Sequence, residues 1–285
     1  MTTSDIQPTS SFAEMGGTSL NAVSTVLKLQ ESGYTVTVEQ FMRNQNLDAL
    51  LQIVTSADAN TNHQHDYVIK NLKENIELIP AAQKLLSDSF MAKCEWYSKC
   101  GNMLADDLTT VYEKWWDALV DDSFAVLTQD GTMKAASLAG DLTVIQNLDL
   151  TDIHPHFITI LDMLQSITTP VLLKYNPQNR QNVVFSKFML GAATDNTAEE
   201  NVALFLLMER KLRDLAQEKH YTITLAENVS PLTQQISDYL GCTRCAEIYP
   251  CTWEDADGQK PFAACSMDFN VTVDVFELNK LDEKE

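Results

Sequence analysis

Apolar positions recur at two different spacings along the chain, and the change of spacing divides it into three segments. Before residue 55 the spacing is helical, as in the run of Ala22, Val23, Val26, Leu27 and Leu29. Residues 56–66 hold almost no side chain that could join a core, which is typical of a linker. From residue 67 onward, short runs of strand length alternate with helical runs. We therefore expect an all-α segment at residues 1–55, a linker at 56–66 and a mixed domain at 67–285.

The third segment predicts a definite order of elements. In chain order, the pattern indicates a strand at 67–69, helices at 77–90 and 104–119, paired strands at 124–128 and 134–138, a helix at 156–167, a long strand at 183–190, a long helix at 199–219, a strand at 221–225, a helix at 231–240 and strands near 243–250 and 263–276. Asp130-Gly131 between the paired strands is a hairpin signal. The expected fold class is α+β (mixed α/β), a central mixed sheet flanked by helices.

The charge of the chain limits its partners. It carries 40 acidic and 20 basic residues, a formal net charge of −20. Binding to phosphate-rich surfaces needs a positive face, so this charge argues against nucleic acid and anionic membranes and suits cationic small molecules better. No run approaches about 20 consecutive apolar residues, and the N-terminus lacks the layout of a secretory signal.

The cysteines favour a reducing compartment. Six cysteines in 285 residues are too few for a disulfide framework, so we expect reduced thiols and a cytoplasmic protein. Cys242-x-x-Cys245 is the one suggestive pair, and no second pair stands at the spacing of a zinc site. We interpret these cysteines as structural, and we expect no metal.

A glycine-containing loop, Phe12-Ala-Glu-Met-Gly-Gly-Thr-Ser19-Leu20, precedes the first helical run. The two glycines allow a tight turn that brings Ser19 to a helix N-terminus, where the helix dipole and free N–H groups favour a phosphate. The alternative is that Thr18 or Ser19 only caps a surface helix. The stretch resembles the attachment site of peptidyl carrier domains, whose signature is F-x-E-x-G-G-x-S-L. This resemblance implies covalent 4'-phosphopantetheine on Ser19, attached by a phosphopantetheinyl transferase.

The element order after residue 67 resembles that of the GNAT acyltransferases. Leu240-Gly241-Cys242 resembles the family's turn after a short helix. Glu247–Pro250 and Asp257–Phe262 are similar to the C-terminal segment of insect arylalkylamine N-acyltransferases. Those enzymes place a catalytic glutamate after a phenylalanine-containing turn, which is the position of Glu95 after Phe90. The resemblance implies that Glu95 is the general base that deprotonates an amine; an ordinary surface glutamate is the alternative.

The GNAT resemblance also implies where an acyl group would be held. Backbone N–H groups of Leu190, Gly191 and Ala192, at the end of the long strand, should bind a thioester carbonyl and stabilise the oxyanion. Thr233, or Ser230 beside it, stands where related acyltransferases keep hydroxyls near the leaving thiolate. For Ser230, which precedes Pro231, we favour a helix cap.

The junction between the long strand and the long helix, residues 193–202, departs from the GNAT pattern. Members that use acyl-CoA have a basic, glycine-rich loop there, which binds the CoA pyrophosphate. This junction has no glycine or arginine, and it contains Asp195, Glu199 and Glu200. Because these carboxylates would repel a pyrophosphate, we expect no free CoA. A carrier tethered by about 11 linker residues would supply the acyl group at high effective concentration instead.

A carrier followed by a GNAT-like domain resembles the C-terminal part of insect β-alanyl-amine synthases, which resemble nonribosomal peptide synthetases. The resemblance implies an upstream adenylation domain in the same polypeptide. It also implies transfer of a β-alanyl group to a biogenic amine such as dopamine or histamine. Only 18 residues precede Ser19, too few for a carrier's first helix and loop, so we expect an incomplete carrier. The alternatives are an acyl-CoA-dependent arylalkylamine N-acyltransferase and a non-catalytic carrier or docking module.

Overall fold

The computed structural model describes residues 19–34, 36–43, 46, 48–50, 67–101 and 103–278. Within these residues one sheet has the strand order β1-β2-β3-β4-β5-β7-β6. Its strands are β1 (Val68–Asn71), β2 (Phe124–Leu127), β3 (Met133–Asp141), β4 (Val184–Ala192), β5 (Ile223–Asn228), β6 (Thr243–Ile248) and β7 (Val271–Glu277). Neighbouring strands are antiparallel except β4 and β5, which are parallel. The predicted mixed sheet and its hairpin are confirmed.

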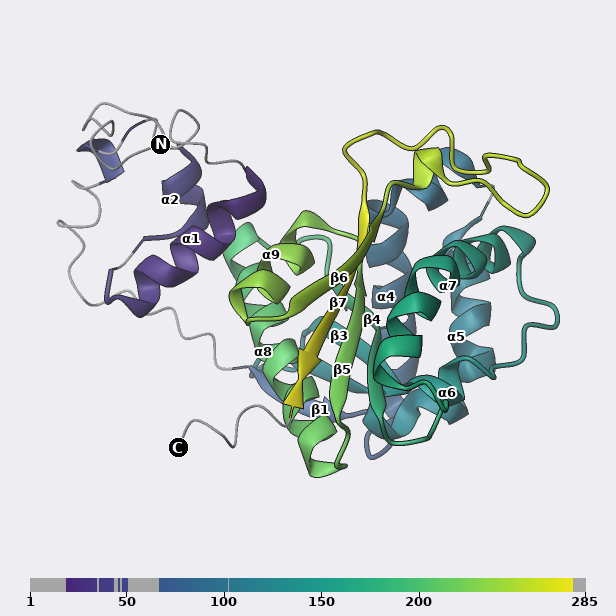
Figure 1. Ribbon diagram of the computed structural model, residues 1–285. Helices are drawn as coiled ribbons and strands as arrows, with labels where there is room; N and C mark the ends of the chain where they lie inside the picture. The colour runs from purple at the N-terminus through teal and green to yellow at the C-terminus, as the bar shows by residue number, and fades with distance from the viewer. Residues whose placement is uncertain are drawn as a thin grey trace.

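Helices cover both faces of the sheet (Figure 1). One face carries α4 (Ile79–Lys93), α5 (Ala105–Leu119), the short α6 (Leu142–Ile145) and α7 (Pro155–Tyr175), and the other carries α8 (Ala198–Glu218) and α9 (Pro231–Tyr239). Single helical turns occur at Ile76–Leu78, Trp96–Cys100, Val120–Asp122 and Pro250–Thr252. The largest buried core lies between the sheet and α4, α5 and α7, and a second one lies under α8. The predicted α+β class is therefore confirmed.

Before the sheet domain, the described residues include the helices α1 (Ser19–Glu31) and α2 (Val38–Arg43). Ala22 and Val26 of α1 pack with Phe41 of α2 in a small apolar cluster. The predicted helix after Ser19 is confirmed, whereas Phe12–Thr18 and the linker at residues 56–66 lie outside the described residues. The proposed domain boundaries therefore stay predictions.

Strands β4 and β5 pair only over their first residues. Their register ends with Ser186 opposite Leu225. Beyond that point β4 stays paired with β3 as far as Ala192, and β5 stays paired with β7 as far as Asn228. The two parallel strands therefore separate toward their C-terminal ends. This separation creates the opening in which the candidate site lies.

The structure corrects two predicted elements. Residues 263–270 are not part of a strand: their backbone groups form turns, such as the hydrogen bond from Cys265 N–H to the Phe262 carbonyl, and β7 begins only at Val271. The helix predicted at 156–167 continues to Tyr175, through Pro170. Pro170 lies on the exposed side of α7. A proline has no N–H, so the helix lacks one backbone hydrogen bond here. Because this side is exposed, water can bind the carbonyl that is left without its helical donor.

Helix α7 is long and apolar enough to span a membrane, the one such helix among the described residues. By itself this is weak support for a membrane span, because core helices share these properties. Here Phe157, Ile160 and Met163 are buried in the main core against the sheet.

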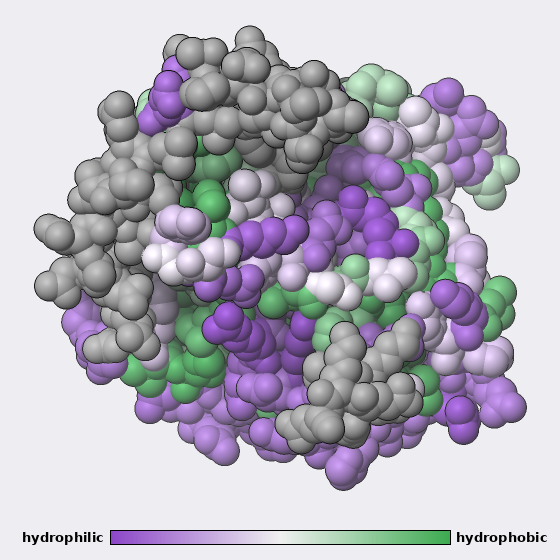
Figure 2. All heavy atoms as spheres, turned by 60° about the vertical axis from the view of Figure 1, so that its left-hand side comes forward, coloured by the Kyte–Doolittle hydropathy of each residue, from purple (hydrophilic) through white to green (hydrophobic). Residues whose placement is uncertain are grey.

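On the face turned forward in Figure 2, hydrophilic side chains are prominent beside the grey residues, in keeping with the excess of acidic residues.

A buried ion pair joins the sheet to α8. Lys187 Nζ of β4 lies 2.6 Å from Glu209 Oε2 of α8, and both side chains are almost fully buried. Removing one partner leaves an uncompensated charge, which costs about 3–5 kcal/mol. We expect Lys187→Met to lower the free energy of unfolding by this amount in urea titrations. The double variant Lys187→Met/Glu209→Leu should recover most of the loss, and an equal loss in both variants would contradict this pairing.

Candidate functional site

A narrow cavity opens where β4 and β5 separate. About 70 Å³ of it is accessible to the centres of water molecules. Its walls carry the aromatic rings of Phe90, Trp96, Tyr97, Phe157 and Phe188. The polar side chains that reach it include Lys187, Glu209, Glu227 and Thr233. This first cavity is therefore an apolar slot with a few polar groups, the usual composition of a small-molecule site.

A second cavity lies beside the first, on the face of the sheet that α7 covers. Its volume accessible to water centres is larger, about 130 Å³. The two cavities share Leu161, Leu164, Phe188 and Glu227 as lining residues. Trp115 and Trp116 are both buried in the main core, and Trp115 also lines the second cavity. Glu227 is thus the carboxylate common to both cavities.

Glu227 is the residue in this site that the sequence interpretation missed. It lies on β5, and its Oε1 accepts a hydrogen bond from the Thr168 hydroxyl of α7. In the described part of the chain, its other oxygen accepts no hydrogen bond. Burial removes water from this carboxyl and thereby raises its pKa. Part of the Glu227 side chain is nevertheless open to the cavities. The predicted strand ended at Leu225; continuing its alternation of Ile223 and Leu225 would have reached Glu227.

The N–H groups at the end of β4 point in alternate directions. Ala193 N–H donates to the Lys134 carbonyl on the β3 side. By the alternation of an antiparallel strand, Gly191 N–H also faces β3, and Leu190 and Ala192 N–H face the opening. Ala192 N–H donates to Ser89 Oγ at 3.3 Å. Of the three predicted donors, Leu190 is therefore the one placed to serve the cavity, which it also lines.

Gly191 has a packing role. A Cβ atom at this position would lie 3.0 Å from Leu86 Cδ2 and 3.1 Å from Ser89 Cβ, both on α4. These distances are tighter than ordinary van der Waals contact. The glycine therefore lets α4 pack closely against the end of β4, where the aromatic wall of the first cavity begins.

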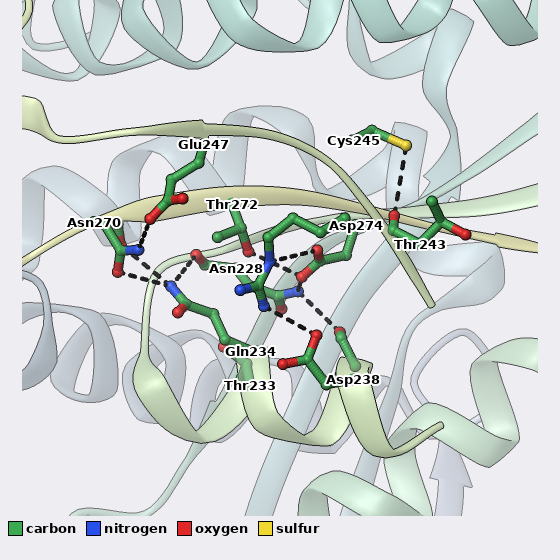
Figure 3. A network of polar contacts seen from close by, with 12 residues as sticks. Asn228, Thr233, Gln234, Asp238, Thr243, Cys245, Glu247, Asn270, Thr272 and Asp274 are labelled. Atoms are coloured by element: carbon green, nitrogen blue, oxygen red, sulfur yellow. Dashed lines mark hydrogen bonds and ion pairs between the residues drawn. The ribbon is translucent and has the colours of Figure 1, made fainter. Parts of the chain in front are cut away.

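Thr233 lies in the first turn of α9 and lines the first cavity. Ser230 caps this helix, as expected: its Oγ accepts a hydrogen bond from Thr233 N–H at 3.2 Å. A polar network ties α9 to the sheet (Figure 3). In it, the Asn228 side-chain amide donates to Ser237 Oγ of α9 and to Asp274 Oδ2 of β7. The network thereby fixes Thr233 at the edge of the cavity.

Glu95 lies beside the aromatic wall and does not line either cavity. Its carboxylate accepts hydrogen bonds from Ser266 N–H at 2.6 Å and from the Ser266 hydroxyl at 3.2 Å, and it pairs with Lys99. The Ser266 N–H bond, followed by the contact with Lys99, lowers the pKa of Glu95. The next residue, Trp96, is part of the cavity wall. The role of Glu95 as a general base stays a prediction.

The N-terminus of α8 is closed by its own side chains. The Thr197 hydroxyl accepts a hydrogen bond from Glu200 N–H, and the Glu200 carboxylate accepts one from Thr197 N–H at 2.8 Å. This is a capping box. Glu199 stands in the same first turn. The capping box occupies Glu200 N–H, and the carboxylates of Glu199 and Glu200 make this end unfavourable for an incoming pyrophosphate.

Helix α1 packs on α9 and on the first half of α8 (Figure 1). Val23 N–H donates to Gln235 Oε1 of α9 in a buried hydrogen bond of 2.9 Å. Val23 and Leu27 form an apolar cluster with Val202 of α8. At the end of α1, Glu31 accepts a hydrogen bond from the Tyr239 hydroxyl.

These contacts fix the direction of α1. Val23 near its start meets Gln235, and Glu31 at its end meets Tyr239, so α1 and α9 run in the same sense. Ser19 is the first residue of α1; its side chain lies outside the description. The start of α1 is therefore directed toward the first turn of α9, where Thr233 lines the cavity.

The two cysteines at metal-ligand spacing contact different partners. Cys242 Sγ accepts a hydrogen bond from Arg213, and Cys245 Sγ lies 3.9 Å from the Tyr175 hydroxyl. Among the residues that the structure describes, no three His, Cys, Asp or Glu side chains are grouped as metal ligands.

Comparison with known proteins agrees with this arrangement. Residues 1–54 match the family described as the phosphopantetheine attachment site, which supports covalent phosphopantetheine. The chain is 26% identical over 275 residues to the β-alanyl-bioamine nonribosomal peptide synthetase Ebony of Drosophila melanogaster. This chain resembles Ebony. The match covers 92% of this chain and 30% of Ebony, so the chain spans under a third of that relative's length.

Solved structures show the same fold. The C-terminal condensation domain of Ebony, solved with β-alanyl-dopamine, superposes with a TM-score of 0.65 at 24% identity, covering 74% of this chain and 98% of that domain. Arylalkylamine N-acetyltransferase 2 of Aedes aegypti gives a TM-score of 0.58 at 14% identity, covering 75% of this chain and all of that one. The GNAT-like fold expected from the sequence is therefore confirmed.

Proposed function

We propose that this chain transfers a β-aminoacyl group, β-alanyl in the first instance, from a phosphopantetheine thioester on Ser19 to the amine of a biogenic amine. The product is an amide. The similarity to Ebony and the match of residues 1–54 to the phosphopantetheine family support this proposal. The proposal includes an adenylation domain upstream in the parent polypeptide and a phosphopantetheinyl transferase as partners.

One observation carries the proposal: the attachment helix is docked on the acyltransferase fold with its start toward the cavity. Ser19 begins α1, and α1 runs in the same sense as α9, whose first turn reaches the cavity at Thr233. The adjoining N-terminus of α8, which would face CoA, is acidic and capped. This arrangement favours delivery from the carrier over delivery by free CoA.

The chain's own groups suit amide formation. Phosphopantetheine attached to Ser19 would supply the acyl group as a thioester. In this proposal Leu190 N–H donates to the acyl oxygen as negative charge develops there. The aromatic walls keep water from competing with the amine. When the amine nitrogen bonds to the acyl carbon, the C–S bond breaks, the sulfur leaves as a thiol and the nitrogen loses one proton.

The test is intact mass spectrometry of the whole chain after treatment with a phosphopantetheinyl transferase and β-alanyl-CoA. We expect a gain of the β-alanyl-phosphopantetheine mass, which falls back to that of phosphopantetheine only after dopamine or histamine is added. Loading without discharge by any amine would support a non-catalytic docking module. Amide formation from free β-alanyl-CoA without loading would support the acyl-CoA alternative.

Docking of α1 should matter for carrier-fed transfer. Val202→Asp places a charge in the apolar cluster with Val23 and Leu27. We expect the rate of transfer from the loaded carrier to fall about 10- to 100-fold, since part of the effective concentration depends on docking. The rate with the N-acetylcysteamine thioester of β-alanine should not change. Leu173→Asp, at a 64% exposed leucine on α7, is the matched control; equal losses with both donors would contradict a docking role.

A further inference from the structure

The strand register places Glu227 deeper in the opening than Leu190. Ser186 of β4 is opposite Leu225 of β5, and Glu227 lies two residues beyond Leu225. Between Ser186 and Met189, β4 has one more residue than the paired segment of β3, so Leu190 lies about three residues' rise beyond Ser186. At a rise of about 3.3 Å per residue, Leu190 is therefore about 3.3 Å nearer the open end than Glu227. A chain that enters from the open end therefore passes Leu190 first and reaches Glu227 beyond it.

The open end is also the end at which the carrier is docked. Thr233, in the first turn of α9, lines the cavity there, and the start of α1 is directed toward it. An acyl group delivered from Ser19 would therefore have its carbonyl near Leu190 and its far end pointing inward, toward Glu227.

Glu227 is suited to bind a cation from this direction. Its Oε1 is held by Thr168, while in the described residues its other oxygen accepts no hydrogen bond. The lysine that lines the same cavity, Lys187, is already paired with Glu209 at 2.6 Å. The surrounding wall is apolar, with Phe157 and Phe188. A carboxylate in such surroundings has a large desolvation cost that a bound ammonium group would offset.

We infer that Glu227 binds the terminal ammonium group of the donor acyl chain. This inference rests on the proposed function and specifies its donor. In an extended 3-aminopropanoyl group, the carbonyl carbon and the nitrogen are three bonds apart, a span of about 3.8 Å. A nitrogen whose carbonyl lies at the depth of Leu190 therefore reaches the depth of Glu227, where a charge-assisted hydrogen bond of about 2.8 Å can form.

The test measures binding to the whole, unloaded chain by isothermal titration calorimetry, with amide products as probes. We expect N-β-alanyl-dopamine to bind about 10- to 100-fold more tightly than N-propionyl-dopamine, which lacks only the amino group. In Glu227→Gln this preference should disappear. Glu113→Gln, at an exposed glutamate of α5, is the matched control and should keep it.

Three outcomes would overturn the inference. They are an unchanged preference for N-β-alanyl-dopamine in Glu227→Gln, an equal loss of affinity for both probes, and a weakened binding of dopamine alone, which would assign Glu227 to the acceptor amine. The proposed function is tested separately, by the carrier-loading experiment. If the carrier loads and no amine discharges it, transfer is disproved, whereas the calorimetric preference still reports on Glu227.

Discussion

Replacing Ser19 with alanine is expected to abolish both loading and carrier-fed amide formation. Phosphopantetheine attachment needs a hydroxyl oxygen at the start of α1, and alanine supplies none. Alanine is a good helix former, and Ser19 is the first residue of a helix whose packing is made by Val23, Val26 and Leu27. The variant should therefore keep its circular dichroism spectrum and its Tm while showing no gain of mass.

The matched control is Ser32→Ala. Ser32 lies just after α1, and its hydroxyl donates to the Lys28 carbonyl at 2.9 Å. This variant should load and discharge as the unmodified sequence does. Ser19→Ala should still react with the N-acetylcysteamine thioester of β-alanine, since the cavity between β4 and β5 is unaltered. A mass gain in Ser19→Ala would place the attachment on another residue and contradict our interpretation of the loop.

Elements with strong local signals could be predicted from the sequence. The hairpin between β2 and β3 turns at Gly131, whose φ of +88° is readily adopted only by glycine. Helix α8 begins after Thr197, where Glu200 completes a capping box, and α9 ends before Gly241, whose φ is +76°. Each signal lies within a few residues of the boundary that it determines. These boundaries agree with the structure to within one or two residues.

Features that depend on distant contacts could not be predicted. Residues 263–270 alternate enough to indicate a strand, yet Glu95, 171 positions away, binds the Ser266 backbone and holds the segment in turns. The contact between Val23 and Gln235 spans 212 positions. Neither partner carries a local signal for the other. The docking of α1 and the shape of the loop near Ser266 are therefore properties of the folded chain alone.

The residues of the candidate site differ in the same way: some follow local signals in the sequence, and others depend on distant contacts. Ser19 begins α1, the helix that the local pattern predicts, and Thr233, chosen by resemblance to related acyltransferases, lies in the first turn of the predicted helix α9; their roles stay predictions. The three N–H donors could be located from the predicted strand, but which one faces the opening depends on how β4 pairs with β3. Glu227 belongs to two cavities formed by β4, β5 and α7 together, and no spacing in the sequence indicates that.

Glu95→Gln is expected to lower kcat about 10²- to 10⁴-fold if the resemblance to the arylalkylamine acyltransferases assigns the general base correctly. The rate should also lose its decline at acidic pH. That decline should lie below the ordinary range of a glutamate, because hydrogen bonding to Ser266 lowers the pKa of Glu95. The measurement is kcat for amine discharge as a function of pH, with the chain fully loaded. Lys99→Met is the companion variant, and by removing the paired cation it should move the acidic limb upward.

The contacts of Glu95 also allow a purely structural role. The effect of Glu95→Gln on Tm distinguishes this role from general-base catalysis. A carboxylate with a lowered pKa stabilises the fold above its unfolded pKa, and this contribution is lost as the pH falls through the folded value. Glu95→Gln should therefore lower Tm at neutral pH and leave it unchanged in strong acid. If kcat stays within about threefold while Tm falls, Glu95 only anchors the Ser266 loop beside the Trp96 wall. Proton removal from the acceptor amine would then need another group.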